Sequence, residues 1–126
     1  MTKPVATSTA KPRWTDTQRE RRDEAKDGWT VVANMATDTK LIEWAKSEGR
    51  FVRIDRATDW GNPFHLPGDG DRDTVCDNYE KHYLNHKPSL VARLPGELGG
   101  GKVLACHCHP RRCHGDCLAE LANAHS

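Results

Sequence analysis

The chain has 126 residues, a length that suits one domain built around a single hydrophobic core. Its 19 basic and 18 acidic residues leave a net charge of +1, which excludes a global field for nucleic acid or an anionic membrane. No apolar run approaches the roughly 20 residues that span a bilayer, so we expect a cytoplasmic protein without a membrane partner. In a reducing compartment, its five cysteines indicate a metal site or reactive thiols rather than a disulfide framework.

The N-terminal segment, residues 1–28, is predicted to be a flexible polar arm. Residues 1–13 have almost nothing to bury and are expected to be disordered. A capping box that begins at Thr15 predicts a helix, but this helix has no apolar stripe by which packing could hold it firmly. We therefore expect a disordered or weakly helical arm, followed by one domain over residues 29–126.

Strand and helix patterns alternate through residues 29–126. A strand, helix and strand of this length form a right-handed crossover unit, which gives parallel strands. The sequence therefore predicts a single α/β domain with a small, mostly parallel sheet flanked by helices. Hydrophobic periodicity places strands at residues 29–33, 51–56 and 103–105, and it places helices that begin near residues 38, 71, 89 and 114.

The loop of residues 59–71 carries aromatic side chains between a strand and a helix. Loops of this length inside a compact domain are usually functional or disordered, and the aromatic content argues against disorder. Trp60 and Phe64 offer stacking faces, Gly61 allows a close approach, and the Asn62 amide can both donate and accept hydrogen bonds. Alternatively, the loop folds back and its aromatic side chains plug the core; the two interpretations are compatible.

The segment of residues 106–117 concentrates cysteine and histidine. It holds four of the five cysteines and three of the seven histidines, between a short apolar strand and the start of the last predicted helix. Open α/β sheets bind ligands at the carboxyl ends of their strands. The unpaired N–H groups and the dipole at a helix start favour a thiolate and bind anions. The segment therefore predicts a functional site.

Two motifs in this order resemble a known family. Trp-Gly-Asn-Pro-Phe at residues 60–64, followed by Cys-x-Cys-x-Pro-x-x-Cys-His-Gly-Asp from residue 106, is similar to a small phage and bacterial family named only as a domain of unknown function. The resemblance spans about residues 29–124, and it implies a location in the cytoplasm of a bacterium or of a phage-infected host cell. The Cys-His pair is more distantly similar to a second uncharacterised α/β family that ends in Cys-His-Arg. His107, His109 and Cys117 depart from the first pattern and are the weakest candidates for a shared role.

A site without metal is one interpretation of the cysteine-rich segment. In an enzyme, Cys113 would be the nucleophile, His114 the acid or base, and Asp116 the orienting carboxylate. Neighbouring arginines would hold a phosphate, and the aromatic loop would stack on a base. The predicted ligand-binding residues are Trp60, Gly61, Asn62, Phe64, Arg111 and Arg112.

A zinc site is the second interpretation, because thiolates and an imidazole fall within one loop. The spacing is imperfect, since two candidate ligands are adjacent and no paired Cys-x-x-Cys knuckles are present. A third interpretation treats the cysteines as small buried hydrophobes, which suits Cys106 and Cys117 better than the others. The predicted zinc ligands are Cys108, Cys113 and His114, with Cys106, or alternatively His109, as the fourth.

The sequence leads to a small α/β domain that binds or processes a nucleotide, a nucleoside or a nucleic-acid end at its cysteine-rich loop. If it is an enzyme, we expect a hydrolase or transferase directed at nucleotides or nucleic acid. The alternative is a non-enzymatic zinc-binding adaptor that contacts protein or nucleic acid. These alternatives leave open the cofactor, which would be zinc or none, and any protein partner.

Overall fold

The computed structural model describes residues 13–64, 68–109 and 111–124. Within them, three strands form one parallel sheet in which the last strand of the chain is central, so the order is β1-β3-β2. Val103 of the central strand lies opposite both Val31 and Phe51. The predicted α/β class with a small parallel sheet is therefore confirmed. The strands are β1 (Val31–Asn34), β2 (Phe51–Arg53) and β3 (Val103–Cys106).

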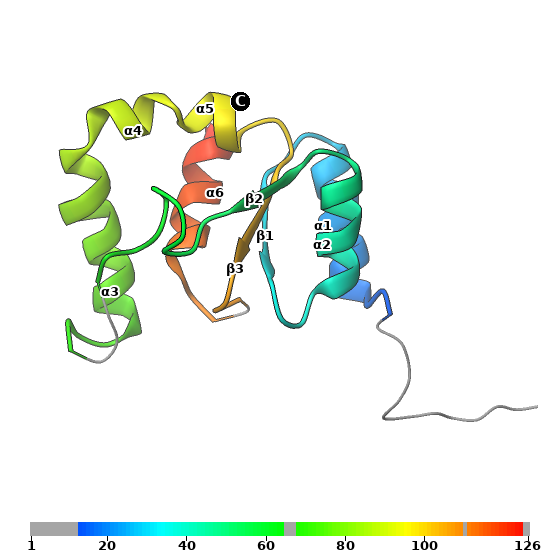
Figure 1. The fold of residues 1–126 in the computed structure, drawn as a ribbon, viewed down its shortest axis with the longest axis horizontal. Coiled ribbons are helices and arrows are strands. Elements are labelled where there is room, and N and C mark those ends of the chain that lie inside the picture. The colour runs from blue at the N-terminus through cyan, green and yellow to red at the C-terminus, as the bar shows by residue number, and fades with distance from the viewer. Residues whose placement is uncertain (1–12, 65–67, 110, 125–126) are drawn as a thin grey trace, which may run out of the picture.

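Helices cover both faces of the sheet, as Figure 1 shows. Two helices pack on one face, and three helices from the second half of the chain contribute to the hydrophobic cluster on the other. Among the described residues, no helix is long and apolar enough to cross a membrane. The first face carries α1 (Asp16–Lys26) and α2 (Thr39–Ser47), and the second carries α4 (Pro88–Ala92), α5 (Leu94–Leu98) and α6 (His114–Ala124). Helix α3 (Arg72–Asn78) lies on the same side as α6, farther from the strands (Figure 1).

The central strand supplies both hydrophobic clusters, because its side chains alternate between the two faces. Val103 and Ala105 face the cluster with α1 and α2, whereas Leu104 and Cys106 face the cluster with α6. All four side chains are buried, as expected for a parallel strand covered on both sides. The alternation therefore places Cys106, the last residue of β3, on the α6 side of the sheet.

Helix α1 is held by polar contacts rather than by the apolar stripe that its sequence lacks. Gln18 is buried, and its Oε1 accepts a hydrogen bond of 2.9 Å from the Leu41 backbone N–H. Arg21 pairs through both terminal nitrogens with Asp38 and also donates to the Val32 carbonyl at 2.7 Å. These polar contacts, which the sequence pattern did not reveal, fasten the helix to β1 and to the start of α2.

The other parts of the predicted arm remain open. Residues 1–12, which we expect to be disordered, lie outside the described residues. The division of the chain between residues 28 and 29 stays a prediction. Helix α1 nevertheless contacts β1 and α2 and contributes the fully buried Ala25 to the core, so at least residues 16–26 are part of the packed structure.

Helix α3 begins at the predicted cap, where the Asp71 side chain accepts a hydrogen bond of 2.8 Å from the Thr74 N–H. The helix continues through a π-helical turn at Tyr79–Tyr83 and a short 3-10 turn at Leu84–His86. The wider turn carries Tyr79 into the core, where its hydroxyl donates to the Trp60 carbonyl at 2.7 Å. This contact ties α3 to the aromatic loop.

Candidate functional site

A cavity of about 300 Å³ lies at the carboxyl end of the central strand. Its walls come from three segments: the loop that follows β2, the first half of α3, and the cysteine-rich segment between β3 and α6. This is the edge at which open α/β sheets place their ligands. The structure therefore brings the two sequence motifs to one site, although Pro110 of the second motif and residues 65–67 after the first lie outside the described residues.

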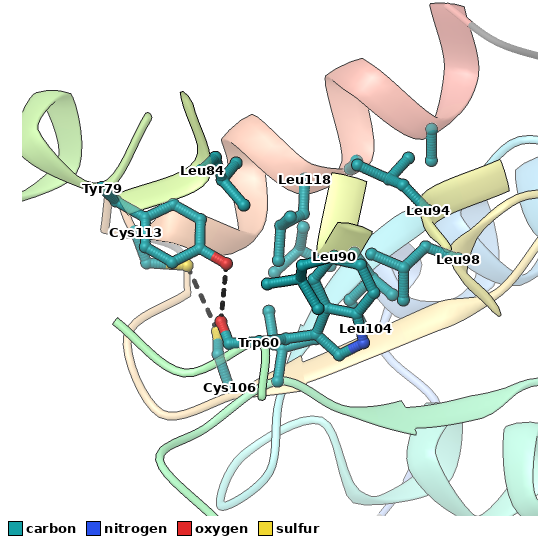
Figure 2. Close-up of a cluster of buried hydrophobic side chains, with 14 residues drawn as sticks. Trp60, Tyr79, Leu84, Leu90, Leu94, Leu98, Leu104, Cys106, Cys113 and Leu118 are labelled. Carbon is teal, nitrogen blue, oxygen red and sulfur yellow. Dashed lines mark hydrogen bonds between the residues drawn. The ribbon is translucent and has the colours of Figure 1, made fainter. Parts of the chain in front are cut away.

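The sulfur atoms of Cys106 and Cys113 lie 3.4 Å apart on the wall of this cavity. Figure 2 shows the two side chains pointing toward each other, from the end of β3 and from the start of α6. Both are nearly fully buried, with 1% and 3% exposure, so the cavity gives a ligand its access to them. The structure thus places in direct contact two cysteines that lie seven residues apart in the sequence.

One sulfur of this pair is favoured as the thiolate. The hydrogen bond with Cys113 lowers the pKa of Cys106 to about 6 despite burial, with further help from the backbone N–H groups of His109 and Cys108. The same contact, together with burial, raises the pKa of Cys113. Among the described residues, Cys106 receives two backbone donors, whereas Cys113 receives one, the Gly115 N–H at 3.3 Å. We therefore assign the thiolate to Cys106 and the donating thiol to Cys113.

The start of α6 forms a capping box around Cys113. The Cys113 sulfur accepts from the Gly115 N–H, and Asp116 Oδ2 accepts from the Cys113 N–H at 3.2 Å. A Cβ on Gly115 would come within 2.8 Å of the Ile54 side chain, so glycine lets the helix start lie against the sheet. Asp116, predicted to orient His114, instead caps the helix from an exposed position.

His114 is buried beneath the cavity and held in one tautomer. Its Nε2 lies 2.5 Å from the Ile54 carbonyl oxygen. Because a carbonyl can only accept, Nε2 carries the hydrogen and Nδ1 is the acceptor. Burial lowers the pKa of this imidazole, which therefore stays neutral near pH 7. Any acid or base role for His114 must pass through Nδ1.

The aromatic loop divides between the core and the cavity. Trp60 is 2% exposed and packs among leucines (Figure 2). Its Nε1 donates to Glu97 Oε1 at 3.2 Å. Its predicted role as a stacking platform at the cavity is thus corrected. Gly61 allows a close approach of the loop to the backbone at Arg56 rather than to a ligand, because a Cβ there would lie 2.6 Å from the Arg56 Cα.

The rest of the loop does reach the cavity. Asn62 and Phe64 both line it, as predicted. The buried Asn62 amide is already bound at both ends, since Nδ2 donates to the Val75 carbonyl and Oδ1 accepts from the Phe64 N–H. Asn62 therefore fastens the loop to α3, and Phe64 is the aromatic residue of this loop that lines the cavity.

The arginines at the cavity differ from those predicted. Arg111 is exposed, and Arg112 pairs with Asp73 and Asp77 on α3; neither lines the cavity. Arg56 and Arg72 line it instead.

Both cavity arginines are fixed by backbone carbonyls. Arg56 donates to the carbonyls of Asn62 and Phe64, and Arg72 donates to that of Arg112. Among the described residues, neither forms an ion pair with a carboxylate, so both charges remain available to an anion.

Two further polar residues line the cavity. From the sequence, His107 was treated as a weak candidate, and Asp55 was not identified. His107 Nε2 lies 3.4 Å from Asp55 Oδ2, and the hydrogen bond from Arg53 lowers the pKa of Asp55. The His107 side chain is 58% exposed, so it can exchange protons with solvent. His107 seemed a weak candidate because it departs from the motif. Asp55 could have been found from the sequence, because it follows a strand at the carboxyl edge of the sheet, where the site forms.

The predicted zinc ligands are not assembled for a metal. Cys106 and Cys113 are about as close as two ligands of one zinc ion, for which Zn–S bonds of roughly 2.3 Å imply about 3.7 Å between sulfurs. Cys108 lines the same cavity, but His114 directs Nε2 at a backbone carbonyl. In the part of the chain that the structure describes, no three His, Cys, Asp or Glu side chains are grouped to hold a metal ion.

Comparison with known proteins places the chain in a family. The domain of unknown function DUF4326 matches residues 39–124, from the start of α2 to the end of α6. An uncharacterised 12.4 kDa protein of Enterobacteria phage T4, from the nrdA-td intergenic region, is 32% identical over 73 residues, which cover 57% of this chain and 67% of the phage protein. No solved structure matches. The chain belongs to the DUF4326 family of phage and bacterial domains.

Proposed function

We propose that the cavity binds a small phosphorylated ligand of nucleotide or nucleoside size, and that Cys106 acts on this ligand as a nucleophile. The observation that carries the proposal is that one cavity is lined both by the Cys106 and Cys113 thiol pair and by two arginines that have no carboxylate partner among the described residues. The candidate nucleophile and the anion-binding groups therefore line the same cavity.

The two arginines favour a phosphate over a neutral ligand. A guanidinium group presents a planar fork of donors that matches the oxygens of a phosphate. Arg56 and Arg72 are each fixed by backbone carbonyls, so less side-chain freedom is lost when an anion binds. Arg112 already has two carboxylate partners and is the weaker choice.

The size and lining of the cavity favour a ligand with a flat ring. A volume of about 300 Å³ lies at the lower end of the range for small-molecule sites. Phe64 offers an aromatic face there, in the role that the sequence had given to Trp60. A nucleoside monophosphate combines such a ring with an anion. A nucleic-acid end would present the same two groups.

The thiol pair and the neighbouring histidine favour covalent catalysis. The Cys106 thiolate would form a bond to an electrophilic atom of the ligand, while the Cys113 thiol steadies the negative sulfur in the free enzyme. His107, oriented by Asp55, would donate a proton to the leaving group. Water or a second substrate would then release the product, which is the chemistry of a hydrolase or a transferase.

A thermal-shift screen of nucleosides and nucleotides tests this proposal. We expect mononucleotides to raise the melting temperature of the reduced protein, because a ligand that binds only the folded state stabilises it. Arg56→Ala and Arg72→Ala should abolish the shift, whereas the matched control Arg19→Ala, on the exposed face of α1, should retain it. Cys106→Ser should still bind the ligand but lose turnover. A screen in which no phosphorylated compound shifts the wild type would contradict the proposal.

The alternative, a zinc-binding adaptor, is supported by the closeness of the two sulfurs and by Cys108 on the same cavity. It would require Cys108 to join the pair and His114 to leave its carbonyl partner. Elemental analysis of protein purified without a His tag separates the two. About one zinc ion per chain, with unfolding on chelation, would favour the zinc-binding adaptor. Folded protein without metal would exclude the adaptor.

A further inference from the structure

We propose that Cys106 and Cys113 form a reversible redox couple that reduces small hydroperoxides entering the cavity and closes to a disulfide. This activity goes beyond the proposed ligand binding and does not depend on it. Its basis is the direct contact of the two sulfurs, 3.4 Å apart, on the wall of a cavity that admits small molecules. Four of the five cysteines line that cavity, but among the described residues only this pair is in sulfur-to-sulfur contact.

The local structure allows the pair to close. The sulfurs must approach by about 1.4 Å to reach the bonded distance of about 2.0 Å. The connecting residues 107–112 lie between the end of β3 and the start of α6, and the described ones belong to no helix or strand. A small movement of this connection can therefore bring the sulfurs together without breaking the sheet. Cys76 is held on α3 and Cys117 within α6, so neither has this freedom.

The chemistry divides between the two cysteines. The Cys106 thiolate attacks one oxygen of the hydroperoxide, the O–O bond breaks, and the departing oxygen takes a proton to leave as an alcohol or water. Cys106 is thereby oxidised by two electrons to a sulfenic acid. The Cys113 sulfur then attacks the Cys106 sulfur, the S–O bond breaks, and the hydroxide leaves with the Cys113 proton as water. In total, two thiols and one hydroperoxide give a disulfide, an alcohol and water, and an external dithiol restores the thiols.

Neighbouring groups favour this direction of attack. The Cys106 sulfur accepts backbone N–H groups from Cys108 and His109, which fix it at the cavity wall. His107 lines the same cavity and is oriented by Asp55, so it can supply the proton to the leaving oxygen. Cys113 is held at the helix start by the capping box, which keeps its sulfur facing Cys106. The structure therefore gives Cys106 the first step and Cys113 the second.

Peptide mapping of the oxidised protein tests the couple. The fully reduced wild type is treated with one equivalent of hydrogen peroxide, remaining thiols are alkylated, and tryptic peptides are analysed without reduction. Cleavage after Lys102, Arg111 and Arg112 separates the two cysteines. We expect the loss of two thiols per chain, a peptide 103–111 linked to a peptide 113–126, and full reversal by dithiothreitol.

Variants assign the link, because each peptide carries a second cysteine. Cys108→Ser and Cys117→Ser serve as matched controls and should retain the link. Cys113→Ser should abolish it and leave a sulfenic acid at Cys106 that dimedone captures. The proposal is overturned if the wild type keeps its five thiols, or if the link survives Cys113→Ser. If a variant fails to fold, fragmentation of the linked wild-type peptides assigns the two bonded cysteines instead, and the nucleotide screen is judged separately by its thermal shift.

Discussion

The two faces of the sheet are built from one central strand but differ in kind. On the face of α1 and α2, the cluster is formed by small and aliphatic side chains, and polar groups such as Gln18 and the Arg21–Asp38 pair complete it. On the face of α6, the cluster contains Trp60, Tyr79 and sulfur atoms, and it opens into the cavity. The α1 and α2 face is therefore a packed core, whereas the α6 face is a core that also lines the candidate site.

This difference follows from alternation along a strand of four residues. Ala105 points to the closed face, and Cys106, the next residue, points to the face with the cavity. A slip of one residue in register would exchange the two sets and bury Cys106 against α1 and α2. The pairing of β3 with strands on both sides fixes that register. Changes on the two faces should therefore have separable effects on stability and on thiol chemistry.

The largest effect is expected on the α6 face, at Trp60. Trp60→Ala should lower the free energy of unfolding by about 4 kcal/mol, because it removes a buried indole and opens a void beside the leucines. Urea denaturation measures the loss. Phe64→Ala is the matched control, since Phe64 is only half-buried and lines the cavity; it should cost less stability and remove more ligand binding. If Trp60→Ala instead removed more ligand binding and cost less stability than Phe64→Ala, Trp60 would be the residue that stacks on the ligand.

A smaller effect is expected on the α1 face, at Asp38. Asp38→Ala should cost about 2 kcal/mol, because it leaves the half-buried Arg21 guanidinium without its carboxylate. The alkylation rate of Cys106 should not change, since the substitution lies on the other face. Asp16→Ala, which removes the exposed partner of Arg19, should stay within about 0.5 kcal/mol of the wild type. Altered Cys106 reactivity in Asp38→Ala would show that the two faces are coupled.

The sequence predicted some elements of the fold and not others, depending on whether apolar or polar residues hold each element in place. Apolar periodicity was sufficient for the strands and most helices, because buried parallel strands and amphipathic helices have distinct repeats. The packing of α1 was missed because Gln18 and Arg21, polar residues that are usually exposed, hold it in place. Similarly, the residue type of Trp60 could not tell a core side chain from a ligand platform.

The candidate site was predicted in place but not in detail. The cysteine-rich segment was identified because two rare residue types cluster there. The pairing of Cys106 with Cys113 required the turn between β3 and α6, which spacing alone does not define. Arg112 appeared available because its partners Asp73 and Asp77 lie on another element, α3. Arg56 and Arg72 belong to other segments as well, and only the fold brings them to the cavity.

A further effect is expected on the pH dependence of stability. Burial lowers the pKa of His114 in the folded state below the ordinary value of 6.5, so the unfolded chain binds the additional proton first as the pH falls. Stability should therefore decrease below about pH 6.5, by at most about 1.4 kcal/mol per pH unit for one group.

Two comparisons isolate the contribution of His114. His109, whose pKa is also lowered by burial, acts in the same direction. Asp38 contributes only below its ordinary 3.8, because its folded-state pKa is lower still: burial alone would raise it, but the contacts with Arg21 and the Asn34 N–H outweigh that effect. Urea midpoints from pH 7 to pH 5 should fall less in His114→Gln than in the surface control His86→Gln. Parallel curves for both would contradict the assignment.

The most direct test of the central claim is the alkylation rate of each cysteine as a function of pH. Reduced wild-type protein is pulsed with iodoacetamide between pH 5 and pH 9, and labelled peptides are quantified by mass spectrometry. If Cys106 is the thiolate at the cavity, its labelling should reach half its maximal rate well below the ordinary thiol value of 9.0, while Cys113 stays largely unlabelled. Faster labelling of Cys113, or a half-maximal rate for Cys106 near the ordinary thiol value of 9.0, would contradict the account.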